Sequence, residues 1–351
     1  MDTRRIVARH LVVALVAIAL VGCSPAPSTP AGPKLKVGLV VDSGSENDKS
    51  FNEYTLKGAR EAATAAGLDF FYLTSQSDLD YERHVESLVS QGANLVITVG
   101  FRMGDATAKA ARRHPNIKFA IVDVPFFPGA GCAETATDCY SAEGGLTNVT
   151  SLTFAEDQVG YLAGVLAGCM TRSGTVATVA GLEIPPVARY VNGFERGARS
   201  VSPGLVMLHR YIPDFDDPAT GKVVAQGFIQ QGADVIFVAA GNTGNGGLLA
   251  AKEAGRMAIG VDVDQYFSYP DVRDALLTSA AKNMDVATAA AVRDFAAGQL
   301  ASGIRTSTLA NGGIGLAPYH DWDDRIPQSC KDRVAEATST VKADPTITGA
   351  S

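Results

Sequence analysis

The chain contains two similar segments in the same order. LVSQGANLVITVG (88–100) is similar to FIQQGADVIFVAAG (228–241), a spacing of 140 residues from 88 to 228. LKGAR (56–60) is similar to ERGAR (195–199), and a tripeptide ending in Asp, IVD and then GVD, follows each longer match. Three matches in one order indicate two copies of a supersecondary unit. Because 351 residues also exceed what one hydrophobic core usually serves, we expect two lobes.

Each copy alternates short apolar runs with segments of helical periodicity. In the first copy, buried strands are expected at 36–41, 70–73, 94–99 and 117–122, with helices near 51–66, 79–91 and 103–113. In the second copy, strands are expected at 174–180, 205–211, 234–239 and 257–261. This alternation predicts an α/β fold with two doubly wound parallel-sheet lobes. Facing lobes form a bilobal binding protein whose functional residues lie on loops at the carboxyl ends of the strands.

The N-terminal residues have the order of a secretory signal. Three arginines precede the apolar run LVVALVAIALVGC (11–23), which is too short for a membrane span. LVGC (20–23) resembles a bacterial lipobox, so we expect a lipoprotein signal peptide at 1–22 and a lipid on Cys23; an ordinary signal with a chance Cys is the alternative. The Pro/Ser/Ala-rich residues 23–34 are expected to be a flexible linker. These features predict a protein anchored to the cell membrane on its extracytoplasmic face.

The charge of the chain argues against nucleic acid as a partner. The formal net charge is -7, and removing three Arg and one Asp with residues 1–22 gives -7 - 2 = -9. An acidic chain without basic clusters does not suit a polyanion.

Four cysteines remain besides Cys23, an even number suited to an oxidising compartment. Three pairings are possible. Cys132 and Cys139 lie in one Gly-rich loop, so we expect them to pair locally and Cys169 to pair with Cys330. A metal site is disfavoured because no CxxC or clustered His accompanies them.

Phe51 lies in a polar run between the first strand and the first helix. Ser50 and Glu53 have the spacing of a capping box that would start this helix. Helical spacing from Phe51 to Tyr54 and beyond also allows a core role for Phe51. At a spacing of 139 residues, however, Phe51 corresponds to Tyr190 (51 to 190), so each copy places an aromatic ring at the start of the equivalent helix. Two such rings on facing lobes could close on a flat ligand, whereas Phe194 is expected in the core.

The run GNTGNGG (241–247) resembles a phosphate-binding loop. It lacks the GK[ST] of a P-loop and the GxGxxG spacing after a strand. We therefore expect it to form a tight turn near the cleft, with Gly241 beside the ligand.

Several motifs resemble one family when taken together. These are ENDKSFN, VNGFERGA, GNTGNGGLLAAKEAG, GVDVDQ, TSAAKNMDVA and GLAPYHDW, in order from 46 to 322. They are similar to the basic membrane protein family of ABC-transporter substrate-binding lipoproteins over nearly the whole chain after the signal. The resemblance implies a type I periplasmic-binding-protein-like fold with two hinged lobes. We expect 35–152 with 283–320 in lobe 1, and 153–282 with 321–351 in lobe 2.

Binders of this family typically take purine nucleosides, which implies roles for particular residues. By that resemblance Phe51 and Tyr190 would sandwich the base, and Asn52 and Asp123 would read its polar edge. Because a carboxylate only accepts hydrogen bonds, Asp123 would favour bases with N–H groups, as in guanosine or inosine. The ribose would be held by Asp262 and Lys282, and Asp42 is a further candidate.

Each of these assignments has a simpler alternative. Asp123 and Asp262 could cap loops, and Lys282 could be solvated. The sequence also departs from the family pattern: it has SGSENDKSFN where GGINDKSFN is commoner, Tyr190 where Phe is more usual, and a cysteine-containing loop near Asp123. These departures leave the preferred base open.

The predicted function is that of a receptor, not an enzyme, and requires no cofactor or metal. A monomer would capture a purine nucleoside, close by hinge motion and deliver it to an ABC permease and its ATPase. A sensor, or a receptor for a sugar or another small molecule, is the alternative. A nucleoside hydrolase is disfavoured, since the chain lacks a clustered Asp run and a GxSxG elbow.

Overall fold

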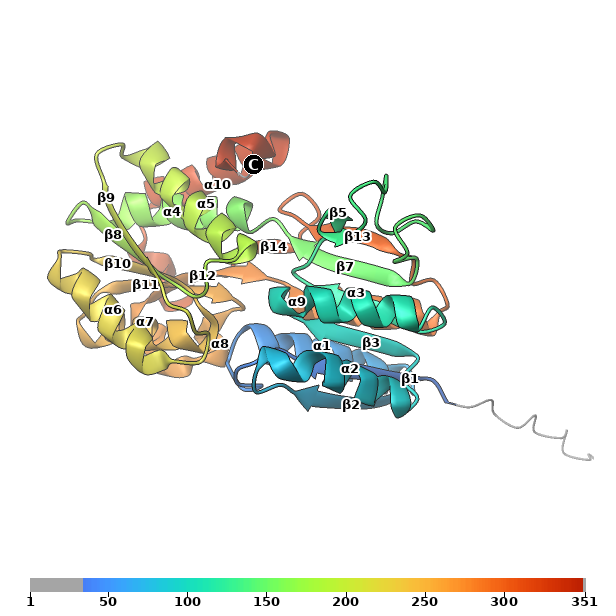
Figure 1. Cartoon of the computed structure of the whole chain (residues 1–351). Coiled ribbons are helices and arrows are strands. Elements are labelled where there is room, and N and C mark those ends of the chain that lie inside the picture. The colour runs from blue at the N-terminus through green and yellow to red at the C-terminus, as the bar shows by residue number, and fades with distance from the viewer. Residues whose placement is uncertain (1–33, 350–351) are drawn as a thin grey trace, which may run out of the picture. The chain divides into compact units, whose positions relative to one another are not determined.

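Two six-stranded sheets form the framework of the chain from Leu35 onward (Figure 1). The computed structural model describes residues 34–349. The predicted signal peptide, Cys23 and all but the last residue of the predicted linker therefore lie outside the described residues. The first sheet contains β1 (Lys36–Val41), β2 (Asp69–Thr74), β3 (Leu95–Val99), β4 (Lys118–Val122), β7 (Val149–Phe154) and β13 (Gly303–Ser307). The second contains β8 (Thr175–Ala180), β9 (Val206–Tyr211), β10 (Val235–Ala239), β11 (Met257–Asp262), β12 (Leu276–Lys282) and β14 (Ile314–Leu316).

The two sheets confirm the duplication. Their orders are β13-β7-β4-β3-β1-β2 and β14-β12-β11-β10-β8-β9, so the first four strands of each copy occupy equivalent places. Neighbouring strands run parallel, except for the antiparallel pair β12 and β14. Asp123 and Asp262, which end the matching tripeptides, both have left-handed backbones, with φ of 68° and 66°. The repeat therefore extends to the backbone conformation at the carboxyl ends of β4 and β11.

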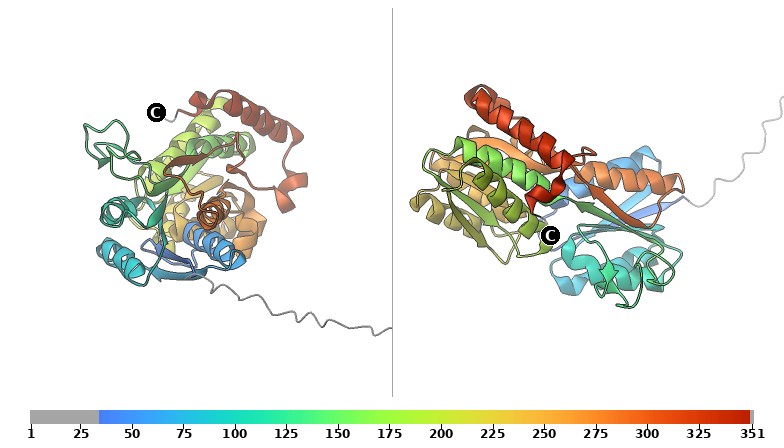
Figure 2. Two further views of the ribbon diagram at one scale, coloured as in Figure 1. Left: turned by 90° about the vertical axis from the view of Figure 1, so that its right-hand side faces the viewer. Right: turned by 90° about the horizontal axis from the view of Figure 1, so that it is seen from above.

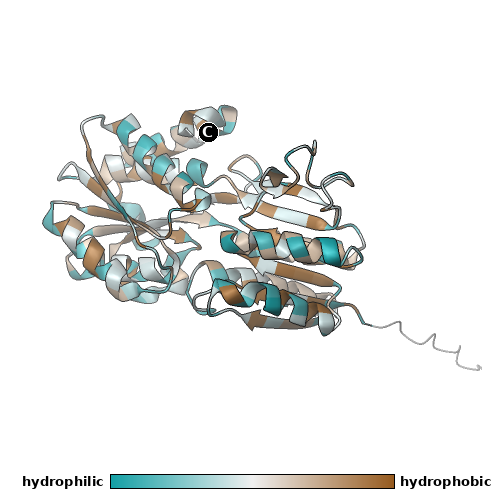
Figure 3. Cartoon of the chain, viewed as in Figure 1, coloured by the Kyte–Doolittle hydropathy of each residue, from teal (hydrophilic) through white to brown (hydrophobic). Residues whose placement is uncertain are grey.

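The first sheet is covered by helices on both faces, as the sequence predicted. Successive strand residues point to opposite faces: Val37 and Leu39 belong to the apolar cluster that includes residues of α1 (Phe51–Ala65). Val40 belongs instead to the cluster formed by α2 (Tyr81–Ser90) and α3 (Gly104–Arg113). The helix α9 (Met284–Ala296) packs beside α1. Figure 3 shows the hydrophobic strands between helices whose outer faces are hydrophilic.

The second sheet lies between two groups of helices (Figures 1 and 2). The helix α4 (Glu156–Met170) packs against α5 (Pro185–Val201) and α10 (Gln328–Ala343), and α6 (Pro218–Gln230) packs against α7 (Gly241–Glu253). The approach of α4 and α5 requires glycine, because a Cβ at Gly197 would lie 1.9 Å from the Tyr161 carbonyl oxygen. This close packing fixes the position of Tyr190 on α5.

The run GNTGNGG forms the first two turns of α7, so the prediction of a tight turn was wrong. The cause is tertiary packing: a Cβ at Gly246 would lie 1.8 Å from the Pro218 carbonyl oxygen of α6. Helix propensity alone disfavours such a glycine-rich helix. Gly241, with φ of 53°, starts this helix at the edge of the cavity described below.

Three connections join the lobes in the described part of the chain: β7 to α4, β12 to α9, and β13 to β14. Two predicted lobe boundaries differ from these positions. The first sheet continues to Phe154 in β7, and Ile314–Leu316 belongs to the second sheet although lobe 1 was expected to extend to 320. The difference arises because β14 pairs with β12 and covers an edge that would otherwise be open.

Both expected disulfides are present. Cys132 pairs with Cys139 near the short strands β5 (Phe127–Pro128) and β6 (Gly131–Cys132). Cys169 pairs with Cys330 and joins α4 to α10. The local and the long-range pairing predicted from the sequence are thus confirmed.

Candidate ligand-binding site

A cavity lies between the lobes, lined by residues that follow the carboxyl ends of strands in both sheets. It encloses about 610 Å³ of space not filled by protein atoms, a volume that includes open solvent. All eight predicted ligand-binding residues line it: Asp42, Phe51, Asn52, Asp123, Tyr190, Gly241, Asp262 and Lys282. Residues far apart in the sequence are therefore brought to one place by the duplicated fold.

The start of α1 is capped differently from the prediction. Ser50 makes no side-chain cap; its hydroxyl donates to Asp262 Oδ2 over 2.8 Å. The cap comes from Asp48, whose carboxylate accepts the backbone N–H groups of Ser50, Asn52 and Glu53 at 2.9–3.1 Å. Burial raises the pKa of Asp48 to about 7, although these donors favour its charged form. The capping-box prediction was therefore wrong, because Ser50 is used in a contact between the lobes.

Residues 48–50 of the first lobe bind three elements of the second lobe. Asn245 of α7 donates to the Asp48 carbonyl oxygen over 3.0 Å, in addition to the Ser50–Asp262 bond. Ser268, in α8 (Gln265–Ser268), donates to the Lys49 carbonyl oxygen over 2.7 Å. These bonds hold the two lobes together beside the cavity.

A buried charge cluster at the connections between the lobes reaches the cavity wall through Asp123 and Lys282. Lys282 Nζ donates to Asp123 Oδ2 over 2.7 Å and lies 3.0 Å from Glu156 Oε1 as an ion pair without hydrogen-bond geometry. Arg189 Nε donates to Glu156 Oε2 over 2.6 Å. Burial acts to lower the pKa of Lys282, but the nearby carboxylates, Asp123 foremost, raise it above its ordinary value. Lys282 is therefore a buried cation, not the solvated residue of the alternative interpretation.

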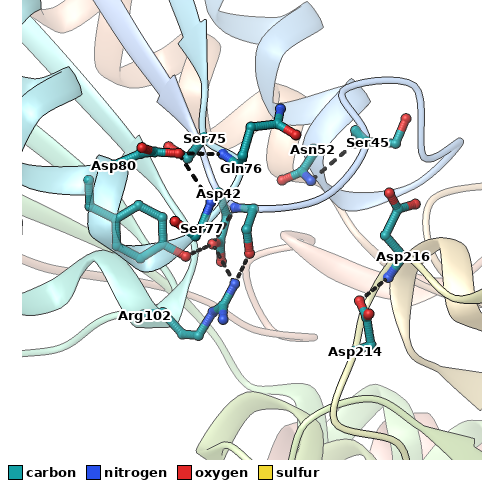
Figure 4. A network of polar contacts seen from close by, with 12 residues as sticks. Asp42, Ser45, Asn52, Ser75, Gln76, Ser77, Asp80, Arg102, Asp214 and Asp216 are labelled. Carbon is teal, nitrogen blue, oxygen red and sulfur yellow. Dashed lines mark hydrogen bonds and ion pairs between the residues drawn. The ribbon is translucent and has the colours of Figure 1, made fainter.

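Two acceptor oxygens at the cavity have no hydrogen-bond partner among the described residues. These are Asn52 Oδ1 and Asp123 Oδ1, and both are buried. The Asn52 amide nitrogen donates to the Ser45 carbonyl oxygen over 3.2 Å (Figure 4), which sets the orientation of the amide. Burial raises the pKa of Asp123 to about 6, while Lys282 favours its charged form. Buried acceptors without partners are costly unless a ligand supplies donors.

Comparison with known proteins identifies the family to which the chain belongs. The model of the Bmp family, described as ABC transporter substrate-binding protein PnrA-like, matches residues 34–341. The chain belongs to this family. It is 30% identical to the ABC transporter nucleoside-binding protein BmpA of Lactococcus lactis subsp. cremoris, over 97% of each chain. It is also 30% identical to basic membrane protein A of Borreliella burgdorferi, over 78% of this chain and 76% of the relative.

Solved structures support the fold. A crystal structure of an ABC transporter solute-binding protein from Aeropyrum pernix K1 aligns with a TM-score of 0.77 and 26% identity, over 89% of this chain and 92% of that chain. A solute-binding protein from Actinobacillus succinogenes with bound D-allose aligns with a TM-score of 0.65 and 15% identity, over 83% and 100% of the chains. This member of the Bmp family therefore has the two-lobed type I periplasmic binding fold. It is a solute-binding component of an ABC transporter, not an enzyme, and such components act on the extracytoplasmic side with a permease and an ATPase.

Tyr190 of this Bmp protein was predicted to lie at the start of its helix, and this prediction was wrong. The helix α5 begins at Pro185, because two prolines are well suited to a first helical turn. Tyr190 therefore lies in the second turn, where its hydroxyl donates to the Ala280 carbonyl oxygen over 3.0 Å and its ring contacts Phe237 edge-on. Tyr190 thus combines a core position with a place in the cavity wall. Phe194 stacks on Phe237 in the core, as predicted.

Asp42 is already occupied by protein groups. Its carboxylate accepts from the Tyr81 hydroxyl, from the Ser43 backbone N–H over 2.6 Å and from Arg102 over 3.2 Å (Figure 4). Burial raises the pKa of Asp42, and these contacts oppose that effect. Asp42 is therefore held in place at the cavity wall and has less free capacity for a ligand than Asp123.

Sequence reasoning missed two aromatic residues of the cavity, Phe101 and Phe215. Phe215 lies in the acidic run DFDD (214–217), a pattern of one aromatic among polar residues like that around Phe51. Phe101 directly follows Gly100 at the end of β3. Both signals were available in the sequence.

The described residues offer no group of His, Cys, Asp and Glu that could hold a metal ion. Within the same range, every helix is too short or too polar to cross a membrane.

Proposed function

We propose that the chain captures a purine nucleoside in the cavity between its lobes and delivers it to the permease. The buried oxygens Asn52 Oδ1 and Asp123 Oδ1 carry this proposal, because their lack of partners calls for a ligand with hydrogen-bond donors, which the N–H groups of a purine base supply. The rings of Phe51, Phe101 and Phe215 in the same cavity suit a flat base. A nucleoside-binding relative that matches 97% of the chain gives independent support.

The ribose would bind where Asp262 and Lys282 line the cavity. Asp262 accepts from Ser50, so a ribose hydroxyl would share or replace that bond. Lys282 also contacts Asp123, which we assign to the base. The base and ribose subsites would therefore be adjacent at the Lys282 ammonium.

Calorimetry of the purified protein tests the proposal directly. Guanosine, inosine and adenosine are compared with uridine, ribose and glucose under the same conditions. Saturable binding of a purine nucleoside is expected. Heat only with a sugar would instead favour the alternative of a sugar receptor with the same fold. Lipid attachment at Cys23, which belongs to the same proposal, is tested by mass spectrometry of the mature N-terminus.

Replacement of Asp123 should change the choice of base. In Asp123→Asn the amide oxygen should take the place of Oδ2 and accept the hydrogen bond from Lys282. The amide nitrogen then takes the place of Oδ1, which has no partner among the described residues. It would face an N–H group of guanine, so two donors would meet where a donor and an acceptor met before. We expect guanosine binding to weaken about 10- to 100-fold, the scale of one hydrogen bond to a charged group. Adenosine, whose ring nitrogen accepts, should lose less. Equal losses for both nucleosides would contradict this assignment of Asp123.

Truncation of Phe51 should weaken stacking. Phe51→Ala is expected to lose about 1–3 kcal/mol of nucleoside binding, the usual value for a base-stacking ring. Tyr54→Ala is the matched control, since Tyr54 lies on the same helix and is partly buried but does not line the cavity. A normal Kd with a lowered melting temperature in Phe51→Ala would assign the ring to the core.

A further inference from the structure

Glu156 is a fully buried carboxylate that does not line the cavity. It is the first residue of α4 and directly follows the connection from β7. Acidic residues are common in the first turn of a helix, so nothing in its local sequence points to a functional role. Its two oxygens, however, contact two cations, Arg189 and Lys282.

The Lys282 ammonium lies where two of the three connections between the lobes come together. Lys282 ends β12 just before the connection to α9. It contacts both Asp123 of the first lobe and Glu156 at the start of α4, over 2.7 and 3.0 Å. The rings of Phe154 and Phe51 lie 5.0 and 5.2 Å from its nitrogen.

The contacts leave Lys282 with free donor capacity at the cavity. An ammonium has three N–H donors, and among the described residues Lys282 forms one hydrogen bond, to Asp123. Glu156 attracts the same nitrogen without forming a hydrogen bond. Arg189 holds the other Glu156 oxygen over 2.6 Å, so this carboxylate cannot easily rotate away.

We propose that Glu156 is a positioning residue that fixes the Lys282 ammonium for a ligand with vicinal hydroxyls, a role that rests on the proposed function. Without Glu156, Asp123 alone would hold the ammonium and draw it toward the base subsite. Glu156, 3.0 Å from the same nitrogen, supplies a second attraction that opposes this shift. The remaining N–H donors then stay directed to the ribose subsite beside Asp262.

The test uses Glu156→Gln in the full-length protein and two ligands, guanosine and its analogue lacking both ribose hydroxyls. The variant keeps the shape of the side chain and removes its charge. We expect the Kd for guanosine to rise about 10-fold or more, as for the loss of a charge-assisted contact. The Kd for the analogue should change less than about twofold, because Lys282 has no hydroxyl to bind there.

Asp157→Asn is the matched control. Asp157 is the next residue of α4 and also a buried carboxylate, but its partner is the Thr348 hydroxyl. This variant should lower the melting temperature and leave both Kd values unchanged. Arg189→Gln, which frees Glu156 without removing it, is the second variant if Glu156→Gln does not fold. It should give a smaller penalty with the same dependence on the ribose hydroxyls.

The outcomes separate the two proposals. Guanosine binding that is unchanged in a folded Glu156→Gln variant would overturn the role of Glu156 alone. An equal penalty for both ligands would also overturn it, since the effect would not pass through Lys282. If the wild-type protein binds no nucleoside, both proposals fall together.

Discussion

Replacement of Lys282 by Met should lower the free energy of unfolding by about 3–5 kcal/mol near neutral pH, the usual cost of removing one partner of a buried ion pair. The side chains of Lys282 and Asp123 are only 2% and 7% exposed, so water cannot replace the lost cation. Glu156 retains Arg189, whereas Asp123 loses its one ion-pair partner among the described residues. Chemical denaturation of the two proteins measures the difference.

The difference in the free energy of unfolding between Lys282→Met and the wild type should shrink as the pH falls. Burial already raises the pKa of Asp123 in the folded protein, and loss of Lys282 removes a contact that lowers it. A carboxylate with a raised pKa binds a proton more readily in the folded than in the unfolded state, so its contribution to stability is present at low pH and is lost as the pH rises through the folded pKa. The variant should therefore approach the wild-type stability near about pH 5. A deficit that does not depend on pH would contradict this explanation.

Lys109→Met is the control for this effect. Lys109 Nζ lies 2.6 Å from Glu82 Oε1, a separation similar to that of the buried pair, but these side chains are 57% and 46% exposed. Exposed pairs contribute little, because water solvates and screens both charges. A large loss in Lys109→Met would show that burial does not decide the cost.

The framework of the fold could be predicted because its signals are local. The apolar runs and helical segments that gave the strands of both copies depend on side-chain periodicity, which the folded structure retains. The matching tripeptides that end at Asp123 and Asp262 were also sufficient to predict that these residues lie at equivalent strand ends. Their shared left-handed backbone is a consequence of the same duplication.

The features that were missed depend on contacts between distant residues. Ser50 and Glu53 have the spacing of a capping box, but Asp262 takes the Ser50 hydroxyl and Asp48 takes over the cap. The glycines of GNTGNGG lie in a helix whose packing leaves little room for side chains: Gly246 meets Pro218 of α6, and Gly244 and Gly247 meet Val238 of β10. Glu156 looks like an ordinary helix start until Lys282 is placed beside it. The sequence patterns located the helices and strands, but they did not identify the hydrogen-bond or ion-pair partners of the polar side chains.

The two disulfides should differ in their contribution to stability because they close loops of different length. Cys169 and Cys330 are 161 residues apart, and Cys132 and Cys139 are 7 apart. In the chain-entropy account the longer loop is worth about 5 kcal/mol and the shorter about 2.5 kcal/mol. The double variant Cys169→Ala/Cys330→Ala should therefore unfold at a much lower denaturant concentration than Cys132→Ala/Cys139→Ala.

The shorter-loop variant is the control for this comparison, since both variants remove one disulfide and introduce the same new side chains.

The packing of α10 should increase the loss of stability when the Cys169–Cys330 disulfide is removed. Cys169 lies in the last turn of the largely buried helix α4, whereas α10, which carries Cys330, has only a few buried side chains, among them Val334 and Val341. Loss of the covalent link should therefore release α10 first, which hydrogen exchange would detect as reduced protection over 328–343. Equal losses of stability in the two variants would show that packing, not the length of the closed loop, holds α10 in place.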